Sequence, residues 1–110
     1  MKKFILLYNG PATAPADMSQ EKRNAVMAKW AEWMSKVKSS LVDMGQPMAN
    51  GVALVDDGSE SMATRLNGYS IIQATNMEAA KTLVDGHPFL SDQTGKFSVE
   101  IFELLPVPKM

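Results

Sequence analysis

The stretch VDGHPFL, residues 84–90, contains the only histidine of the chain, His87. Imidazole is the side chain that changes charge near neutral pH, so His87 is the first candidate for a general acid or base. Asp85, two residues earlier, is the candidate partner for the ring. A catalytic role predicts that the His87 ring faces a cavity and lies within reach of Asp85 or of an aromatic side chain.

The same stretch also has a purely structural interpretation. Gly86 can end a helix, and Pro88 fixes the backbone that follows it. A residue before proline avoids the α region, so His87 would be held extended at a helix exit. We favour this interpretation, because a lone histidine with no predicted orienting partner is weak evidence for catalysis.

A second group of residues has the character of a ligand-binding site. Large aromatic and thioether side chains can line an apolar cavity that has a few polar tips, which suits a small aromatic or lipophilic molecule. The candidate ligand-binding residues are Tyr8, Trp30, Trp33, Met34 and Tyr69. The alternative is that they are ordinary core residues, and the helical spacing of Trp30 and Trp33 favours this alternative. The nine methionines fit both readings.

Composition and motifs exclude several classes of site. The chain has no cysteine, which excludes disulfides, thiolate metal sites and cysteine nucleophiles. Asp56 and Asp57 lie in an expected turn and lack the spacing of a calcium loop. Nucleotide-binding glycine motifs and the His-Glu-x-x-His pattern are absent, so we expect neither a metal nor a cofactor. The 11 basic and 12 acidic residues are scattered and give a net charge of -1, which argues against nucleic-acid binding.

The N-terminus has the outline of an export signal, because Lys2 and Lys3 precede an apolar run. That run stops at Tyr8, before residues 9–11 break it, and is shorter than the about 7–15 apolar residues that an export signal needs. Nowhere does the chain approach the roughly 18 apolar residues of a membrane helix. We therefore expect a soluble, cytoplasmic protein that does not bind membranes.

The first half of the chain predicts a strand and a long helix. The strand, residues 3–8, is apolar on both faces. Ser19 is a good N-cap, and the helix after it should run to about Met44, where Gly45 supplies a left-handed residue and Pro47 prevents resumption. The expected apolar stripe of this helix consists of Val26, Met27, Trp30, Trp33, Met34, Val37, Leu41 and Met44.

The second half predicts three more strands and a shorter helix. The expected strands are residues 51–55, 69–74 and 97–104. Residues 60–66 are ambiguous between a short edge strand and a loop. Thr75 and Glu78 form a capping box that starts the second helix, and Gly86 is well placed to end it.

This order of elements, βαββαβ, is that of the ferredoxin-like fold, in the α+β class, with two helices on one face of an antiparallel sheet. At 110 residues the chain fits one domain, residues 1–110. The first strand and residues 69–74 are apolar on both sides, so the second face of the sheet also needs a cover. A second copy of the chain is the simplest cover, and we expect a homodimer.

Four segments carry a family resemblance: KKFILLYNG, MSQEKRNAVMAKWAEWMSKVKSSLVDMGQPM, NGYSIIQATNMEAAKTLVDGHPFL and FSVEIFELLPV. Together they resemble the YCII-related family over nearly the whole chain. The resemblance implies a dimeric α/β barrel, in which two ferredoxin-like subunits pack sheet against sheet. It also implies a pocket between each sheet and its own helices or loops.

The family's functional pattern carries over only in part. The resemblance implies a histidine on the long helix and an Asp-Asp-Pro-Phe phrase after the second helix, which together would form an acid/base dyad. Here the long helix has tryptophans and no histidine. The phrase GHPF matches only at Pro88 and Phe89, and Gly86 and His87 occupy the two aspartate positions. The family's chemistry therefore cannot simply be assigned to this chain.

Three functions follow as hypotheses. We favour a small dimeric protein that binds a small organic ligand in an apolar pocket. The first alternative is a cofactor-independent acid/base enzyme that uses His87. The second alternative is an accessory or regulatory protein that acts through protein contacts.

Overall fold

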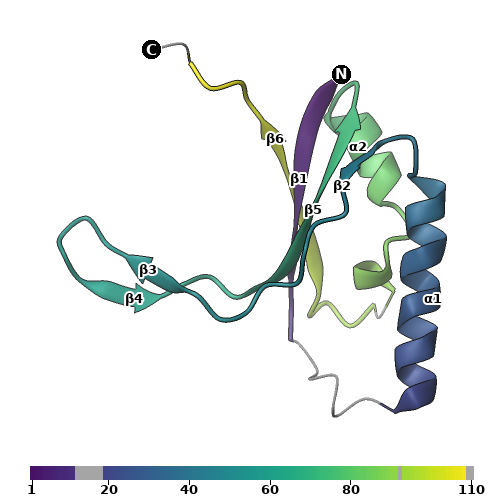
Figure 1. Cartoon of the computed structure of the whole chain (residues 1–110), viewed down its shortest axis with the longest axis horizontal. Coiled ribbons are helices and arrows are strands. Elements are labelled where there is room, and N and C mark those ends of the chain that lie inside the picture. Colours follow the sequence, from purple (N-terminus) through teal and green to yellow (C-terminus); the bar gives the residue numbers. More distant parts are fainter. Residues whose placement is uncertain (12–18, 92, 109–110) are drawn as a thin grey trace.

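The computed structural model describes residues 1–11, 19–91 and 93–108. Its elements are β1 (Lys2–Asn9), α1 (Gln20–Lys36), β2 (Leu41–Asp43), β3 (Val52–Leu54), β4 (Glu60–Met62), β5 (Leu66–Ala74), α2 (Met77–Val84), the 3₁₀ helix η2 (Pro88–Leu90) and β6 (Ser98–Leu104). Four antiparallel strands form one sheet in the order β2-β5-β1-β6, and both α-helices lie on one side of it (Figure 1). The predicted α+β, ferredoxin-like class is confirmed.

The core lies between the sheet and the two helices. On β1 and β5, Phe4 pairs with Ile72 and Leu6 pairs with Ser70, and these four side chains are fully buried. The other buried apolar residues are Tyr8, Trp33, Val37, Ala74, Ala80 and Val84. Because side chains alternate along a strand, the residues between them point to the opposite face.

That opposite face, which we call the open face, has no cover among the residues that the structure describes. Its apolar residues are Ile5, Leu7, Tyr69, Ile71, Phe102 and Leu104. Phe102 is 52% exposed, and its neighbour Ile5 on β1 and the next residue across the sheet, Ile71 on β5, are half-buried. The two-sided apolar pattern of the strands therefore leaves one face packed and the other facing solvent.

Helix α1 is shorter than the sequence predicts. It ends at Lys36, and the segment expected to continue to Met44 instead turns and forms β2. The helical spacing of Leu41 and Met44 predicted the wrong structure, because Leu41 pairs with Ile72 of β5 and Met44 follows the short strand that this pairing forms. The Gln73 N–H donates to the Ser40 carbonyl at 2.8 Å where this pairing begins. Periodicity alone does not detect such a competing partner from a distant segment.

The second predicted strand is also placed differently. Residues 51–55 were expected in the main sheet, but Val52–Leu54 pairs with Glu60–Met62 in a separate two-stranded hairpin, and β2 takes the place beside β5. The ambiguous segment 60–66 thus begins with a strand. We call residues 52–62 the arm, and Figure 1 shows it projecting from the sheet on the side away from the helices. Strand propensity identified β3 but could not identify its partner.

Helix α2 begins one residue later than its predicted capping box implies. Asn76 is the N-cap, and its side-chain oxygen accepts a hydrogen bond from the Ala79 N–H at 2.8 Å, so the cap assigned to Thr75 was wrong. Gly86 has a φ of 81° just beyond the helix end, as predicted. Within the described ranges of the chain, neither α1 nor α2 has the length and apolar character to cross a membrane.

Candidate functional site

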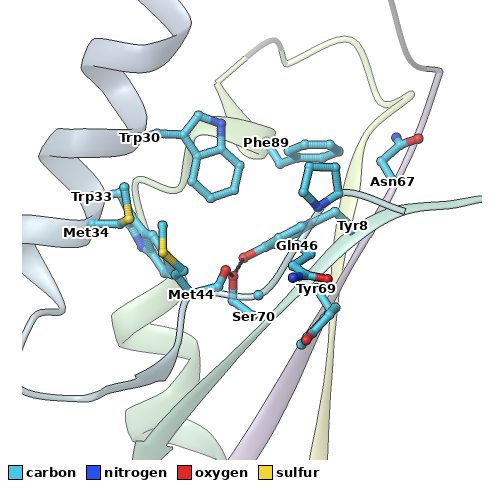
Figure 2. Close-up of a pocket in the computed structure, with 13 residues that line it drawn as sticks. Tyr8, Trp30, Trp33, Met34, Met44, Gln46, Asn67, Tyr69, Ser70 and Phe89 are labelled. Carbon is cyan, nitrogen blue, oxygen red and sulfur yellow. Dashed lines mark hydrogen bonds between the residues drawn. The ribbon is translucent and has the colours of Figure 1, made fainter. Parts of the chain in front are cut away.

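A cavity of about 390 Å³ lies between the sheet and α1 (Figure 2). Its walls come from β1, α1, the segment after β2, β5 and η2. The lining residues are Tyr8, Trp30, Trp33, Met34, Met44, Gly45, Gln46, Pro47, Asn67, Gly68, Tyr69, Ser70 and Phe89. None of these described residues carries a charge, and most present aromatic or apolar atoms.

Helix α1 supplies the wall opposite the sheet. Ser19 caps the helix by accepting a hydrogen bond from the Lys22 N–H at 3.1 Å. Trp30, Trp33 and Met34, spaced by three and four residues, share the face that looks toward the sheet. These three side chains therefore line the same wall of the cavity.

The two tryptophans differ in how they are held. Trp33 is almost fully buried, and its indole N–H donates to the Leu83 carbonyl at 2.9 Å, which ties α1 to α2. Trp30 is half-buried, and its ring meets the Tyr8 ring edge to face at a centroid distance of 5.5 Å. Trp33 is thus a core residue with one surface at the cavity, whereas Trp30 belongs mainly to the cavity wall.

A chain of hydrogen bonds forms the polar part of the cavity. The Tyr8 hydroxyl donates to Ser70 Oγ at 2.6 Å, and the Ser70 hydroxyl donates to the Met44 carbonyl at 2.8 Å. Burial raises the pKa of Tyr8 to about 12, although the hydrogen bond to Ser70 opposes this rise. Tyr8 therefore stays a neutral phenol whose proton is directed at Ser70, and its oxygen keeps acceptor capacity.

Two glycines allow the segment after β2 to lie directly on β5. Gly45 has a φ of 78°, and a Cβ at this position would lie 1.6 Å from the Tyr69 carbonyl oxygen. A Cβ at Gly68 would lie 3.0 Å from the Gln46 carbonyl oxygen. Only glycine permits this backbone approach at residue 45, so the wall formed by residues 44–47 depends on it.

Tyr69 lines the cavity differently from the other predicted residues. Its neighbours Gly68 and Ser70 face the helices, so the Tyr69 side chain projects to the open face. Figure 2 shows its ring pointing away from Tyr8 and Trp30. The backbone of Tyr69 therefore lines the cavity, while its ring lies on the other side of the sheet.

His87 is buried behind this site. It is 1% exposed and is surrounded by three aromatic rings, with centroid distances of 4.4 Å to Trp33 and 4.8 Å to Tyr8 and to Trp30. Its backbone, with φ -61° and ψ 140°, is extended before Pro88, as predicted. The ring is within reach of aromatic groups, but His87 is not one of the residues that line the cavity.

The hydrogen bonding of His87 indicates a structural role. Its Nδ1 accepts the Phe89 N–H at 3.0 Å, which caps η2 and places the proton of the neutral ring on Nε2. Nε2 has no partner among the described residues. Burial lowers the pKa of His87 to about 4, so the ring is neutral at neutral pH. By holding Phe89, whose ring stacks on Tyr8 at 5.1 Å, His87 supports the cavity wall.

Asp85 does not join His87. Its side chain is exposed at the end of α2, and its backbone carbonyl accepts a hydrogen bond from Lys36 Nζ. Among the residues that the structure describes, no hydrogen bond connects Asp85 to the His87 ring. The two predicted catalytic residues are therefore close in sequence but point to different surroundings.

Sequence reasoning missed Ser70, Gln46 and Phe89 as cavity residues. A signal for Ser70 existed, because it is a polar residue at an inward position of a strand whose inward neighbours are apolar. Gln46 reaches the cavity only because α1 ends early, and nothing in its local sequence shows that. No cluster of histidine and acidic side chains in residues 1–11, 19–91 or 93–108 has the geometry of a metal site.

The fold is similar to that of a solved protein. A 5-chloro-2-hydroxyhydroquinone dehydrochlorinase from Burkholderia phenoliruptrix AC1100, solved in complex with 2,5-dihydroxybenzoquinone, superposes with a TM-score of 0.54 at 15% identity. The similarity covers 94% of this chain and 93% of that one, so it extends over the whole ferredoxin-like arrangement. A search of curated proteins finds no match.

A family model gives the more specific result. The model of the YCII-related domain matches residues 1–105, which include every helix and strand described above. The match agrees with the resemblance seen in the four sequence segments. The chain belongs to the YCII-related domain family.

Proposed function

We propose that this protein binds a small, uncharged aromatic molecule that carries a hydroxyl group, in the cavity between the sheet and α1. The observation that carries the proposal is the pairing of aromatic walls with a single polar feature, the hydrogen-bonded hydroxyls of Tyr8 and Ser70. The cavity volume of about 390 Å³ lies within the range of small-molecule sites.

The lining supports an uncharged ligand. A carboxylate or ammonium ion would lose its hydration here and meet no opposite charge among the described lining residues. The rings of Trp30 and Phe89 instead offer flat and edge surfaces to an aromatic ring. An aromatic ligand therefore gains contact area without a desolvation cost for charge.

The direction of the hydrogen bonds supports a hydroxyl group on the ligand. Tyr8 gives its proton to Ser70, and Ser70 gives its proton to the Met44 carbonyl, so both hydroxyls offer acceptor oxygens. A ligand with a hydrogen-bond donor can donate to these oxygens, whereas an ether or a hydrocarbon of the same shape has no proton to donate. The dehydrochlorinase of similar fold binds 2,5-dihydroxybenzoquinone, which is also a small ring with hydroxyl groups.

We assign the predicted binding residues accordingly. Tyr8, Trp30, Trp33 and Met34 contact the ligand through side chains, Tyr69 contacts it through its backbone, and Ser70 joins them. The alternative of an acid/base enzyme that uses His87 and Asp85 has less support, because the ring caps η2 and no hydrogen bond to Asp85 exists among the described residues.

We further propose that the protein works in the cytoplasm as a homodimer of single-domain subunits. Support for the dimer comes from the open face, where apolar residues on three neighbouring strands face solvent in the single chain. A second sheet packed on this face would bury them in a closed, two-fold assembly.

Ligand binding can be tested by quenching of tryptophan fluorescence. We expect hydroquinone to bind about tenfold more tightly than 1,4-dimethoxybenzene, which has no donor, and more tightly than the charged benzoate ion. Tyr8→Phe should reduce the difference between hydroquinone and its dimethyl ether, because it removes one acceptor. Trp30→Phe should lose most of the signal, since Trp33 is buried and hydrogen-bonded. Equal affinity for benzoate, or no quenching by any of the three probes at millimolar concentration, would contradict the proposal.

A further inference from the structure

The arm, residues 52–62, carries three large apolar side chains on one side. Val52 and Leu54 are alternate residues of β3, and Met62 pairs with Val52 across the hairpin. Their exposed fractions are 62%, 77% and 93%. The opposite side of the hairpin carries the small pair Ala53 and Ser61. Glu60, which pairs with Leu54, is the charged residue on the first side. The arm is therefore two-sided, and its mainly apolar side has no cover within the described chain.

An isolated hairpin of this length needs a surface to pack on. Two-stranded hairpins are at best marginally stable in water, and a soluble protein rarely exposes neighbouring large apolar side chains without a partner for them. The arm pairs with no strand of the main sheet. Its apolar side therefore marks an interface rather than part of the core.

The position of the arm indicates what it contacts. Figure 1 shows the arm leaving the sheet on the side opposite the helices, which is the side of the open face. Residues 105–108, after β6, project on the same side, and Leu105 and Val107 there are 74% and 86% exposed. A molecule that covers the open face therefore lies between these two projections.

The size of the open face indicates that it needs the arm. The three long strands have seven to nine residues each and β2 has three, so strands about 4.8 Å apart cover roughly 400 Å². A stable interface takes about 800 Å² from each partner. The sheet surface alone falls short of that area, and the exposed apolar side of the arm projects from the same side of the sheet.

We propose that the arm of each copy packs its Val52, Leu54 and Met62 side chains against a second copy of this chain, whose sheet covers the open face. In a two-fold dimer each copy then holds the other between its arm and its sheet. This inference rests on the homodimer proposed above and adds the residues that stabilise it. A second copy is the occupant that the structure favours, because it brings an equal open face and an equal arm to the same contact.

The test is sedimentation equilibrium of the whole protein over a dilution series. We expect wild type to dimerise, and the triple variant Val52→Ser, Leu54→Ser, Met62→Ser to have a dimer dissociation constant at least about tenfold higher. The matched control, Ser61→Lys, changes the other side of the same hairpin and should change the constant less than about twofold. Hydroquinone quenching should be the same in all three proteins, because the cavity residues are untouched, which also shows that the variants are folded.

A label on the arm gives a second, independent reading. Because the chain has no cysteine, Met62→Cys and Ser61→Cys each provide a single site for a nitroxide spin label. We expect the label at residue 62 to lose mobility as the protein concentration rises through the dimer range, and the label at residue 61 to change less.

The outcomes separate the two proposals. A dimer whose dissociation constant is unchanged by the triple variant, with a mobile label at residue 62, overturns the role of the arm and leaves the dimer in place. A wild-type protein that stays a monomer near 12.0 kDa overturns both. A monomer whose label at residue 62 is immobilised only by added lipid vesicles also overturns the proposal, because the arm then binds membranes.

Discussion

At the scale of single residues, His87 shows how burial decides the chemistry of a side chain. The ring is buried against Tyr8, Trp30 and Trp33, so its charged form is disfavoured and its pKa falls to about 4. One ring nitrogen caps η2 through Phe89. A neutral, buried histidine of this kind stabilises a turn beside the cavity. Because its pKa differs between the folded and the unfolded protein, its protonation changes the free energy of unfolding.

His87 should make the protein less stable in mild acid. Its pKa is about 6.5 when unfolded and about 4 when folded, so between these values only the unfolded state binds the proton. The contribution of His87 is complete above pH 6.5 and decreases as the pH falls toward 4, by up to about 3 kcal/mol. Urea unfolding at pH 7.5 and pH 4.5 measures this loss.

The control for this measurement is His87→Asn, which keeps an acceptor for the Phe89 N–H but cannot titrate. We expect its free energy of unfolding to be lower than that of wild type at pH 7.5, because the smaller side chain leaves space among the rings. Between pH 7.5 and pH 4.5 it should change less than wild type does. Parallel pH profiles for the two proteins would show that His87 is not the group responsible.

At the scale of elements, the end of α1 decides where the cavity lies. Because the helix ends at Lys36, the chain turns back and forms the short strand β2, which pairs with β5. Residues 44–47 then cross over β5. Pro47 forms an isolated bridge with Gly68, which fixes the far end of this segment. A helix that continued to Met44 would leave this wall of the cavity unformed.

Gly45→Ala should test this arrangement. The new methyl group needs the left-handed backbone conformation and meets the Tyr69 carbonyl, so residues 44–47 must move away from β5. We expect a loss of at least about 2 kcal/mol in the free energy of unfolding and weaker hydroquinone quenching. Urea unfolding and fluorescence titration measure the two effects.

Gly95→Ala is the matched control for this change. Gly95 has a φ of 81°, close to the 78° of Gly45, but a Cβ there would meet nothing within 4 Å. Gly95→Ala should therefore lower the free energy of unfolding only by the cost of a left-handed alanine, about 1 kcal/mol, and should leave hydroquinone quenching unchanged. If the two alanine variants were equally stable, close packing at Gly45 would not be what shapes the cavity wall.

At the scale of the whole molecule, one chain builds the cavity while the proposed dimer uses the other face of the sheet. The cavity lies on the helix side of the sheet, and the open face lies on the reverse side of the same strands. We therefore expect ligand binding and dimerisation to be separable by mutation.

Phe102→Lys should prevent dimerisation and leave ligand binding unchanged. Phe102 is 52% exposed on the open face beside Ile5, and a lysine there would place two like charges in a two-fold sheet contact. We expect light scattering to give a mass near 12.0 kDa at concentrations where wild type is a dimer, with hydroquinone affinity unchanged. Loss of ligand binding together with the dimer would mean that the second copy completes the cavity.

The sequence by itself determined the features that depend on neighbouring residues. The pattern of β1 and β5 predicts two strands with apolar residues on both sides, Gly86 predicts the left-handed exit from α2, and Pro88 predicts an extended His87. Family membership was also visible in short segments along the chain. These features come from local conformational preference and from alternation, which the sequence expresses directly.

Only the tertiary structure decided the features that depend on distant segments. Residues 41–43 leave the helical pattern because β5 offers them backbone partners, and Val52–Leu54 pairs within the arm rather than in the sheet. His87 is buried because Trp30, Trp33 and Tyr8, from other elements, close around it. In each case the deciding contact joins residues far apart in the chain, and its free energy exceeds the local preference from which the sequence is read.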